Sequence, residues 1–161
     1  MQPILVITTG GTIDKVYFDA KSDFEVGDSV VGDLLRQANV DQSFEVLGLL
    51  RKDSLELTDE DRALIRDTAT ARPERRIVVT HGTDTMTETA KVLSFLEGKT
   101  IVLTGSLAPA RFAQSDATFN VGMAFAAVQT LAAGVYIVMN GQVFEAGQVR
   151  KDRTKNVFVR C

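Results

Sequence analysis

The stretch that decides the fold lies near the start of the chain: Ile4-Leu5-Val6-Ile7-Thr8-Thr9-Gly10-Gly11-Thr12-Ile13-Asp14. Its first half is a continuous run of apolar, mostly β-branched residues. Its second half is a glycine turn that carries hydroxyl and carboxyl groups. A short apolar run without alternation is typical of a strand that is covered on both faces. The stretch therefore predicts a buried parallel strand that ends in a polar loop.

Similar apolar runs recur along the chain and predict further buried strands. Together with the first run they cover residues 4–8, 44–50, 77–80, 100–103 and 135–139. Sequences with helical start signals separate them. Because strands and helices alternate, we expect an α/β fold with a doubly wound, mostly parallel sheet flanked by helices.

Three of the predicted helices have recognisable ends. Thr58 with Asp61 forms an N-cap pair, and Thr85 with Glu88 matches the spacing of a capping box. A third helix is predicted from Ser115 to Leu131, where apolar positions keep helical spacing. Gly134 follows it and is predicted to be a left-handed C-cap residue.

Length, charge and cysteine content limit the class of protein. The chain has 161 residues and no linker or repeat, so we expect one domain over residues 1–161. A net charge of −3 provides no basic surface, and we expect no nucleic-acid partner. The start of the chain has no charged segment before a short apolar run, which predicts a cytoplasmic protein without a membrane span. One cysteine and one histidine predict neither a disulfide nor a metal site, and we expect no cofactor.

Polar side chains follow three of the predicted strands. A hydroxyl stands next to glycine in each of the segments 8–12, 80–85 and 104–106. In an open α/β sheet, ligands bind at the carboxyl ends of the strands, where loops and helix N-termini converge. We therefore expect the functional site at this edge of the sheet.

Each of these segments also has a simpler interpretation. Gly10-Gly11 lacks the glycine spacing of nucleotide-binding loops and would then be a tight turn. The segment 83–85 would be an ordinary helix N-terminus. His81 stands beside a glycine, no nucleophile elbow accompanies it, and a structural role is favoured over a triad base. Tyr17 would be a surface aromatic residue.

Two motifs nevertheless resemble the paired signatures of bacterial-type L-asparaginases: Thr9-Gly10-Gly11-Thr12-Ile13 and His81-Gly82-Thr83-Asp84-Thr85. The similarity continues through residues 104–106, Pro109, the helix near Ser115 and the segments 138–140 and 149–151, and so covers nearly the whole chain. The resemblance implies the N-terminal α/β domain of the asparaginase/glutaminase family. The second, C-terminal domain of that family has no counterpart in this sequence.

The resemblance also implies roles for individual residues. Thr12 would be the nucleophile, and Tyr17, on a mobile lid, would bind its hydroxyl. Thr83, Asp84 and Lys151 would form a second constellation, in which Asp84 also receives the substrate α-amino group. The remaining substrate-binding positions would be Gly11, Asp53, Ser54 and Ser106, with Asp53 or Ser54 at the α-carboxylate.

These residue types suit amide hydrolysis. An amide carbon is a poor electrophile, so the reaction needs an activated hydroxyl and N–H donors for the oxyanion. We expect the glycine turns and a helix N-terminus to supply those donors. A nearby Asp84 favours the charged form of Lys151. We therefore favour a hydrogen-bonded relay through Thr83 and Lys151 over a free-amine base.

The resulting prediction is the hydrolysis of L-asparagine to L-aspartate and ammonia, with glutamine as a poor substrate. Two alternatives are a non-catalytic module that binds asparagine or aspartate, and an asparaginase-like subunit of a tRNA-dependent amidotransferase. We expect a homodimer or homotetramer, because an open cleft at the strand ends needs a neighbour to cover it. The predicted contact uses the 115–131 helix or the apolar residues Phe144 and Val157-Phe158-Val159. Alternatively, the last segment packs on the core of its own chain.

Overall fold

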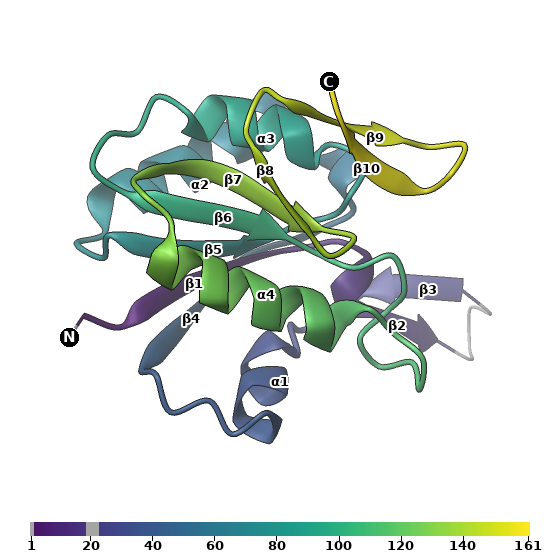
Figure 1. Ribbon diagram of the computed structural model, residues 1–161. Coiled ribbons are helices and arrows are strands. Elements are labelled where there is room, and N and C mark those ends of the chain that lie inside the picture. Colours follow the sequence, from purple (N-terminus) through teal and green to yellow (C-terminus); the bar gives the residue numbers. More distant parts are fainter. Residues whose placement is uncertain (1, 19–22) are drawn as a thin grey trace.

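The computed structural model describes residues 2–18 and 23–161. Its centre is a six-stranded sheet with the order β4-β1-β5-β6-β7-β8 (Figure 1). Neighbouring strands are parallel up to β7, and β8 pairs antiparallel with β7 at one edge. The bounds are β1 (Ile4–Gly10), β4 (Phe44–Lys52), β5 (Arg76–Thr80), β6 (Thr100–Thr104), β7 (Gly134–Met139) and β8 (Gln142–Glu145). Each predicted strand lies within an observed one, which confirms the mostly parallel α/β fold.

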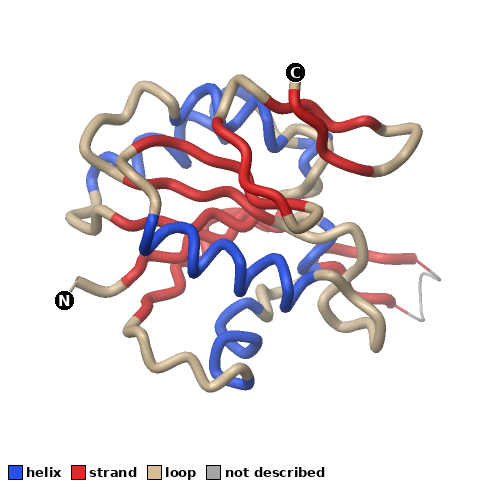
Figure 2. The backbone as a smooth tube through the Cα atoms, in the orientation of Figure 1, coloured by secondary structure: helices blue, strands red, loops and turns tan. Residues whose placement is uncertain are grey.

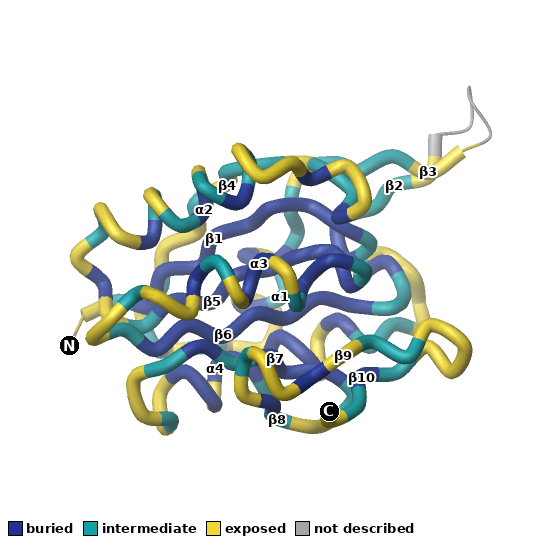
Figure 3. The backbone as a smooth tube through the Cα atoms, turned by 90° about the horizontal axis from the view of Figure 1, so that it is seen from above, coloured by how far each residue is buried: buried dark blue, intermediate teal, exposed yellow. Residues whose placement is uncertain are grey.

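Helices cover both faces of this sheet, as the strand pattern predicts. Figure 2 shows the strands between two pairs of helices. One pair is α1 (Val31–Gln37) with α4 (Ala117–Thr130), and the other is α2 (Asp59–Ala71) with α3 (Met86–Leu93). Ile4 and Val6 of β1 belong to the core under α1 and α4, whereas Leu5 and Ile7 belong to the core under α2 and α3. Every residue of β1 is therefore buried, and Figure 3 shows the central strands as the most buried part of the molecule.

The helix ends agree only in part with the sequence signals. Thr58 and Asp61 form the predicted capping box at the start of α2. Helix α3 starts after Thr85 as predicted, but the capping box is wrong, because the Thr85 hydroxyl donates to the carbonyl of Ser54 instead. The C-cap role of Gly134 is also wrong, since α4 is capped at Leu131 and Gly134 already belongs to β7.

Two small antiparallel hairpins complete the fold. The first follows β1 and consists of β2 (Lys15–Phe18) and β3 (Asp23–Val26). The second is formed by β9 (Val149–Asp152) and β10 (Val157–Arg160) near the C-terminus. Phe144 on β8 and Phe158 on β10 are 2% and 1% exposed and belong to the core. The predicted intersubunit contact through these two residues is therefore wrong, and the alternative that this segment packs on its own chain is correct.

Within the described residues, no helix is both long enough and apolar enough to span a bilayer.

Candidate active site

Loops from three neighbouring strands meet at the carboxyl end of the sheet. Gly11 after β1 has a φ of 85°, and a Cβ atom there would overlap with the backbone of Gly82 after β5. A Cβ atom on Gly82 would in turn lie 2.6 Å from the Cβ of Ser54 after β4. Only residues without a side chain allow backbones to approach so closely. The two glycines thus bring Thr12, Thr83 and Ser54 to one edge of the sheet, as the sequence predicts.

Thr12 begins η1 (Thr12–Asp14), a single turn of 3-10 helix that follows β1. Its side chain is partly exposed. In the part of the chain that the structure describes, neither the Thr12 hydroxyl nor its backbone N–H has a protein partner. The N–H of Gly11, a predicted substrate-binding residue, donates instead to the carbonyl of Lys52 at 2.9 Å. Gly11 therefore allows the loops to pack closely together. Among the described residues, the N–H without a partner at this turn belongs to Thr12.

Thr83, Asp84 and Lys151 form one contact group, although Lys151 comes from the C-terminal hairpin. The Lys151 Nζ lies 2.8 Å from the Thr83 Oγ1 and 3.0 Å from the Asp84 Oδ1. Strand β9 packs beside α3, and this contact brings Lys151 to the start of that helix. Both Thr83 and the Lys151 side chain are largely buried. The predicted second constellation is thus assembled.

In this group Lys151 acts as a hydrogen-bond donor. An ammonium that pairs with Asp84 and donates to the Thr83 oxygen leaves the Thr83 hydroxyl proton free for another acceptor. Among the described residues, the backbone N–H of Thr83 also lacks a protein acceptor. Arg153 adds a second positive charge, with its Nε 3.8 Å from the Asp84 carboxylate.

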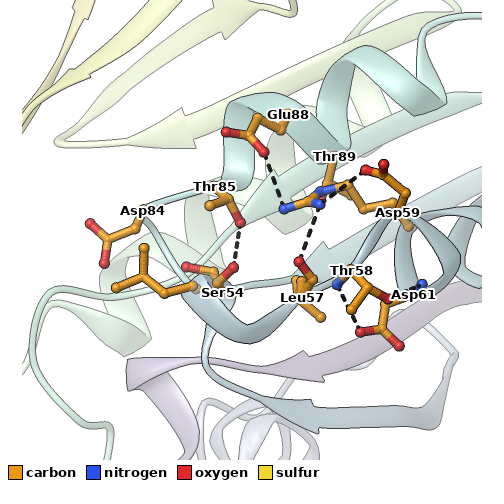
Figure 4. Close-up of polar contacts among 12 residues, drawn as sticks. Ser54, Leu57, Thr58, Asp59, Asp61, Asp84, Thr85, Glu88 and Thr89 are labelled. Atoms are coloured by element: carbon orange, nitrogen blue, oxygen red, sulfur yellow. Dashed lines mark hydrogen bonds and ion pairs between the residues drawn. The ribbon is translucent and has the colours of Figure 1, made fainter.

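Ser54 and Asp53 lie on η3 (Ser54–Glu56) and its N-cap, directly after β4. Ser54 is 1% exposed, and among the described side chains its hydroxyl is one of few buried groups without a hydrogen-bond partner. Its carbonyl accepts the hydroxyl of Thr85 at 2.8 Å, and Figure 4 shows this contact beside Asp84. Asp53 caps η3 and forms an ion pair with Lys15 at 3.2 Å. Ser54 is thus the freer of the two predicted α-carboxylate groups.

Two other predicted site residues are engaged elsewhere. The hydroxyl of Ser106 is buried and donates to the carbonyl of Ala108 at 2.5 Å, within the loop that leads to α4. Tyr17 lies on β2, is 49% exposed, and its ring centroid lies 5.2 Å from that of Phe24. Within the described residues, Tyr17 forms no hydrogen bond with Thr12, so the predicted contact is not present in this structure.

His81 has the structural role that the sequence favours. It is fully buried, with its Nδ1 2.6 Å from the Gly82 carbonyl and its Nε2 2.7 Å from the Thr89 hydroxyl. Because a carbonyl can only accept, Nδ1 carries the proton and Nε2 accepts from Thr89. Burial lowers the pKa of His81 to about 4, and Arg62 adds to this effect. The imidazole is therefore neutral at physiological pH and has no free nitrogen for catalysis.

Sequence reasoning missed two residues next to Thr12. Asp14 is 1% exposed, and burial raises the pKa of its carboxyl group to about 6. It lines a cavity of about 260 Å³ that is also bounded by Thr8, Ser29 and Arg51. Arg111, in the loop before α4, donates to the carbonyl of Asp14. Asp14 directly follows Thr12-Ile13 in the sequence, and this position could have drawn attention to it. Nothing in the sequence singles out Arg111.

The described residues contain no group of three or more histidine, cysteine, aspartate or glutamate side chains that could bind a metal ion.

The sequence matches known proteins of one family. The family model described as "Asparaginase, N-terminal" matches residues 3–158. The chain is 30% identical to a glutaminase-asparaginase of Acinetobacter glutaminasificans, over 92% of this chain and 49% of that protein. A shorter match, 44% identical over 42% of this chain, is to a glutamyl-tRNA(Gln) amidotransferase component from Methanococcus vannielii, of which it covers 16%.

A solved structure agrees with these sequence matches. The thermostable L-asparaginase from Thermococcus kodakarensis superposes with a TM-score of 0.84 at 26% identity, over 99% of this chain and 51% of that one. The chain spans about half the length of the asparaginases it matches. With the family model matched over almost all of its residues, the chain belongs to the asparaginase family and corresponds to the N-terminal region of its relatives.

Proposed function

We propose that this chain hydrolyses the side-chain amide of L-asparagine to L-aspartate and ammonia, with Thr12 as the nucleophile. The observation that carries the proposal is the contact group of Lys151, Thr83 and Asp84, which lies at the same sheet edge as Thr12. Membership of the asparaginase family supports the reaction class.

In the first step, the Thr12 Oγ bonds to the amide carbon and the carbon–nitrogen bond breaks. The hydroxyl proton leaves with the nitrogen as ammonia, and a β-aspartyl ester remains on Thr12. Water then attacks the ester and returns a proton to Thr12. Thr83 passes the proton in both steps. Lys151 donates to the Thr83 oxygen, so the proton of the Thr83 hydroxyl is free to move. The N–H groups of Thr12 and Thr83 stabilise the oxyanion.

Substrate recognition uses the charged ends of the amino acid. The Asp84 carboxylate binds the α-ammonium group, and the Ser54 hydroxyl donates to the α-carboxylate. The buried, unpartnered state of Ser54 supports this role, because a buried hydroxyl without a partner is costly unless a ligand satisfies it. Glutamine is longer by one methylene, which moves its amide away from a nucleophile fixed relative to these two groups. We therefore propose glutamine as a poor substrate.

Assembly and location are part of the same proposal. We propose a homodimer or homotetramer in the cytoplasm, with one subunit covering the strand-end cleft of another. Of the two predicted contact surfaces, α4 remains a candidate, since its Phe119 is 62% exposed.

A second candidate function follows from the match to the amidotransferase component. Such a chain would release ammonia for use by a partner rather than as a free product. A purely binding module is the third possibility, in which the pocket holds asparagine or aspartate without turnover.

The test is ammonia release from L-asparagine by the purified chain alone. We expect steady turnover without a partner, and a kcat/KM for glutamine lower by at least about tenfold, the discrimination expected for one misplaced methylene. Calorimetric titration with L-aspartate accompanies the assay. Binding without turnover would contradict the proposed hydrolase and support the binding module, whereas turnover only with an added amidotransferase partner would support the second candidate.

A further inference from the structure

The β2–β3 hairpin is attached to the sheet at both of its ends by one guanidinium group. Arg111 Nη1 donates to the carbonyl of Asp14 at 3.0 Å, and Nη2 donates to the carbonyl of Asp28 at 2.8 Å. Asp14 immediately precedes β2, and Asp28 follows closely after β3. Residues at the two ends of the hairpin are thus joined through Arg111, which comes from the distant loop between β6 and α4.

The same loop also holds the turn that carries Thr12. The backbone N–H of Ala110 donates to the carbonyl of Ile13 at 3.0 Å, next to the Arg111 contact with Asp14. Asp14 is bound from the other side by the hairpin exit, where Gly27 donates to its carbonyl at 2.9 Å and Val30 to its carboxylate at 3.3 Å. The Thr12 turn therefore lies between two segments and receives hydrogen bonds from both.

An aromatic contact continues this connection away from the sheet. The Phe112 ring, next to Arg111, packs on Phe24 of β3 at 5.7 Å between centroids, and Phe24 packs on Tyr17 of β2. All three rings are partly exposed, so these two ring contacts contribute little to holding the hairpin. Arg111 thus fixes the two ends of the β2–β3 hairpin by polar contacts. The aromatic residues of the hairpin pack on Phe112 of the same loop.

We infer that Arg111 is a positioning residue, which sets the place of Thr12 by tying both ends of the β2–β3 hairpin to the loop before α4. The inference rests on the proposed function, because it assigns Arg111 to the nucleophile of that reaction. η1 is a single turn and cannot fix its own orientation, so its place depends on the hydrogen bonds made to Ile13 and Asp14. The planar guanidinium suits this role, because two of its nitrogens can donate to two carbonyls at once.

The experiment compares Arg111→Met with Arg111→Lys and with Arg66→Met, a control at an exposed arginine of α2 that pairs with Asp67. Tyrosine fluorescence anisotropy reports the hairpin directly, because the chain has no tryptophan and two tyrosines. A Tyr136→Phe background leaves Tyr17 on β2 as the only emitter. Thermal melting of each variant verifies that it is folded, and kcat and inhibition by L-aspartate are measured in parallel.

For Arg111→Met we expect a lower Tyr17 anisotropy and a kcat reduced roughly tenfold, since small displacements of a reacting group cost up to about a hundredfold. Inhibition by aspartate should stay within about twofold, because Ser54 and Asp84 are untouched. Arg111→Lys should behave like Arg111→Met, since one ammonium does not bridge the two carbonyls, and Arg66→Met should match the parent.

Either an unchanged anisotropy or an unchanged kcat in folded Arg111→Met overturns the inference, and so does full rescue by Arg111→Lys. If the parent chain does not hydrolyse asparagine, the proposed function fails by itself. The anisotropy then still decides whether Arg111 holds the hairpin.

Discussion

Lys151 shows at the scale of single residues how contacts define a chemical role. The sequence places it in a charged stretch near the C-terminus, and only the packing of β9 beside α3 brings it to Thr83 and Asp84. The resemblance to asparaginases identifies this residue, whereas its spacing from Thr83 carries no information. Lys151 donates a hydrogen bond to Thr83 and pairs with Asp84, so the three residues form one contact group.

Thr83→Val and Lys151→Met test that contact group. Each substitution should lower kcat by about a thousandfold, because each would interrupt the proposed proton relay. The double variant should be little worse than either single variant, since members of one relay are not additive. Ammonia release under saturating asparagine measures all three rates. Losses that simply multiply would show that Thr83 and Lys151 act independently.

Asp14 makes a prediction about stability rather than rate. Burial raises the pKa of its carboxyl from 3.8 to about 6, against the lowering effects of Ser29, the Val30 N–H and Arg111. Asp28 and Arg51 also bound the cavity beside it. A raised pKa means that the folded state favours the protonated carboxyl. Its contribution to stability is complete below about pH 3.8 and is lost as pH rises through about 6.

Asp14→Asn mimics the protonated side chain and keeps an oxygen for Val30. At pH 8 it should be more stable than the parent by up to about 3 kcal/mol, the free energy that corresponds to the raised pKa of Asp14. The difference should shrink to near zero below pH 4. Urea unfolding from pH 4 to pH 8 measures it, with Asp33→Asn, at an exposed pair with Arg36, as the control. A difference that does not vary with pH would refute the ionisation effect.

At the scale of elements, the parallel strands were predictable because burial on both faces leaves a continuous apolar run. The small hairpins were not. Residues 15–17 of β2 and 23–26 of β3 are at least partly exposed and mix charged with aromatic side chains, so they show no clear period. Thr85 illustrates a further limit: it has the capping-box spacing, yet a tertiary contact with Ser54 takes its hydroxyl. Local patterns do not reveal such competition.

The meeting of the strand-end loops makes a prediction for Gly82. Gly82→Ala would place a methyl group 2.6 Å from the Ser54 Cβ and push apart the loops that carry Thr83 and Ser54. We expect a loss of about 1–3 kcal/mol in stability and an increased KM for asparagine. Gly122→Ala on α4 is the matched control, because its methyl group meets nothing within 4 Å and should stabilise the helix by up to about 1 kcal/mol.

Chemical denaturation and steady-state kinetics of both alanine variants provide the comparison. A Gly82→Ala chain with parental stability and KM would show that the close approach of the loops is not needed for the site.

At the scale of the whole molecule, the fold class followed from the sequence, and the gathering of Thr12, Thr83 and Ser54 followed from the rule that strand ends meet at one edge. The packing of the C-terminal segment could not be predicted from the sequence. Its apolar residues fit an interface or the core equally well, and only the pairing of β8 with β7 and the packing of Phe158 decide for the core. Long-range packing of a short segment leaves no periodic signal in sequence.

Association is the prediction at this scale. We expect sedimentation velocity to show a dimer or tetramer at nanomolar concentration, because an open site would weaken the oxyanion donors. Phe119→Ser on α4 should shift the chain toward monomer, whereas Phe95→Ser, at an even more exposed phenylalanine, should not. A fully active monomer would contradict the prediction and show that one chain closes its own site.

Thr12→Ala, assayed for ammonia release from L-asparagine beside the parent chain, tests whether this molecule is a hydrolase with a threonine nucleophile. The hydroxyl of Thr12 is the proposed attacking group, so we expect turnover to fall by at least about a thousandfold while folding and aspartate binding persist. Mass spectrometry of acid-quenched parent should detect a β-aspartyl group on the peptide that contains Thr12. A Thr12→Ala chain that keeps turnover within about tenfold of the parent would contradict the assignment, because another group would then carry out the attack.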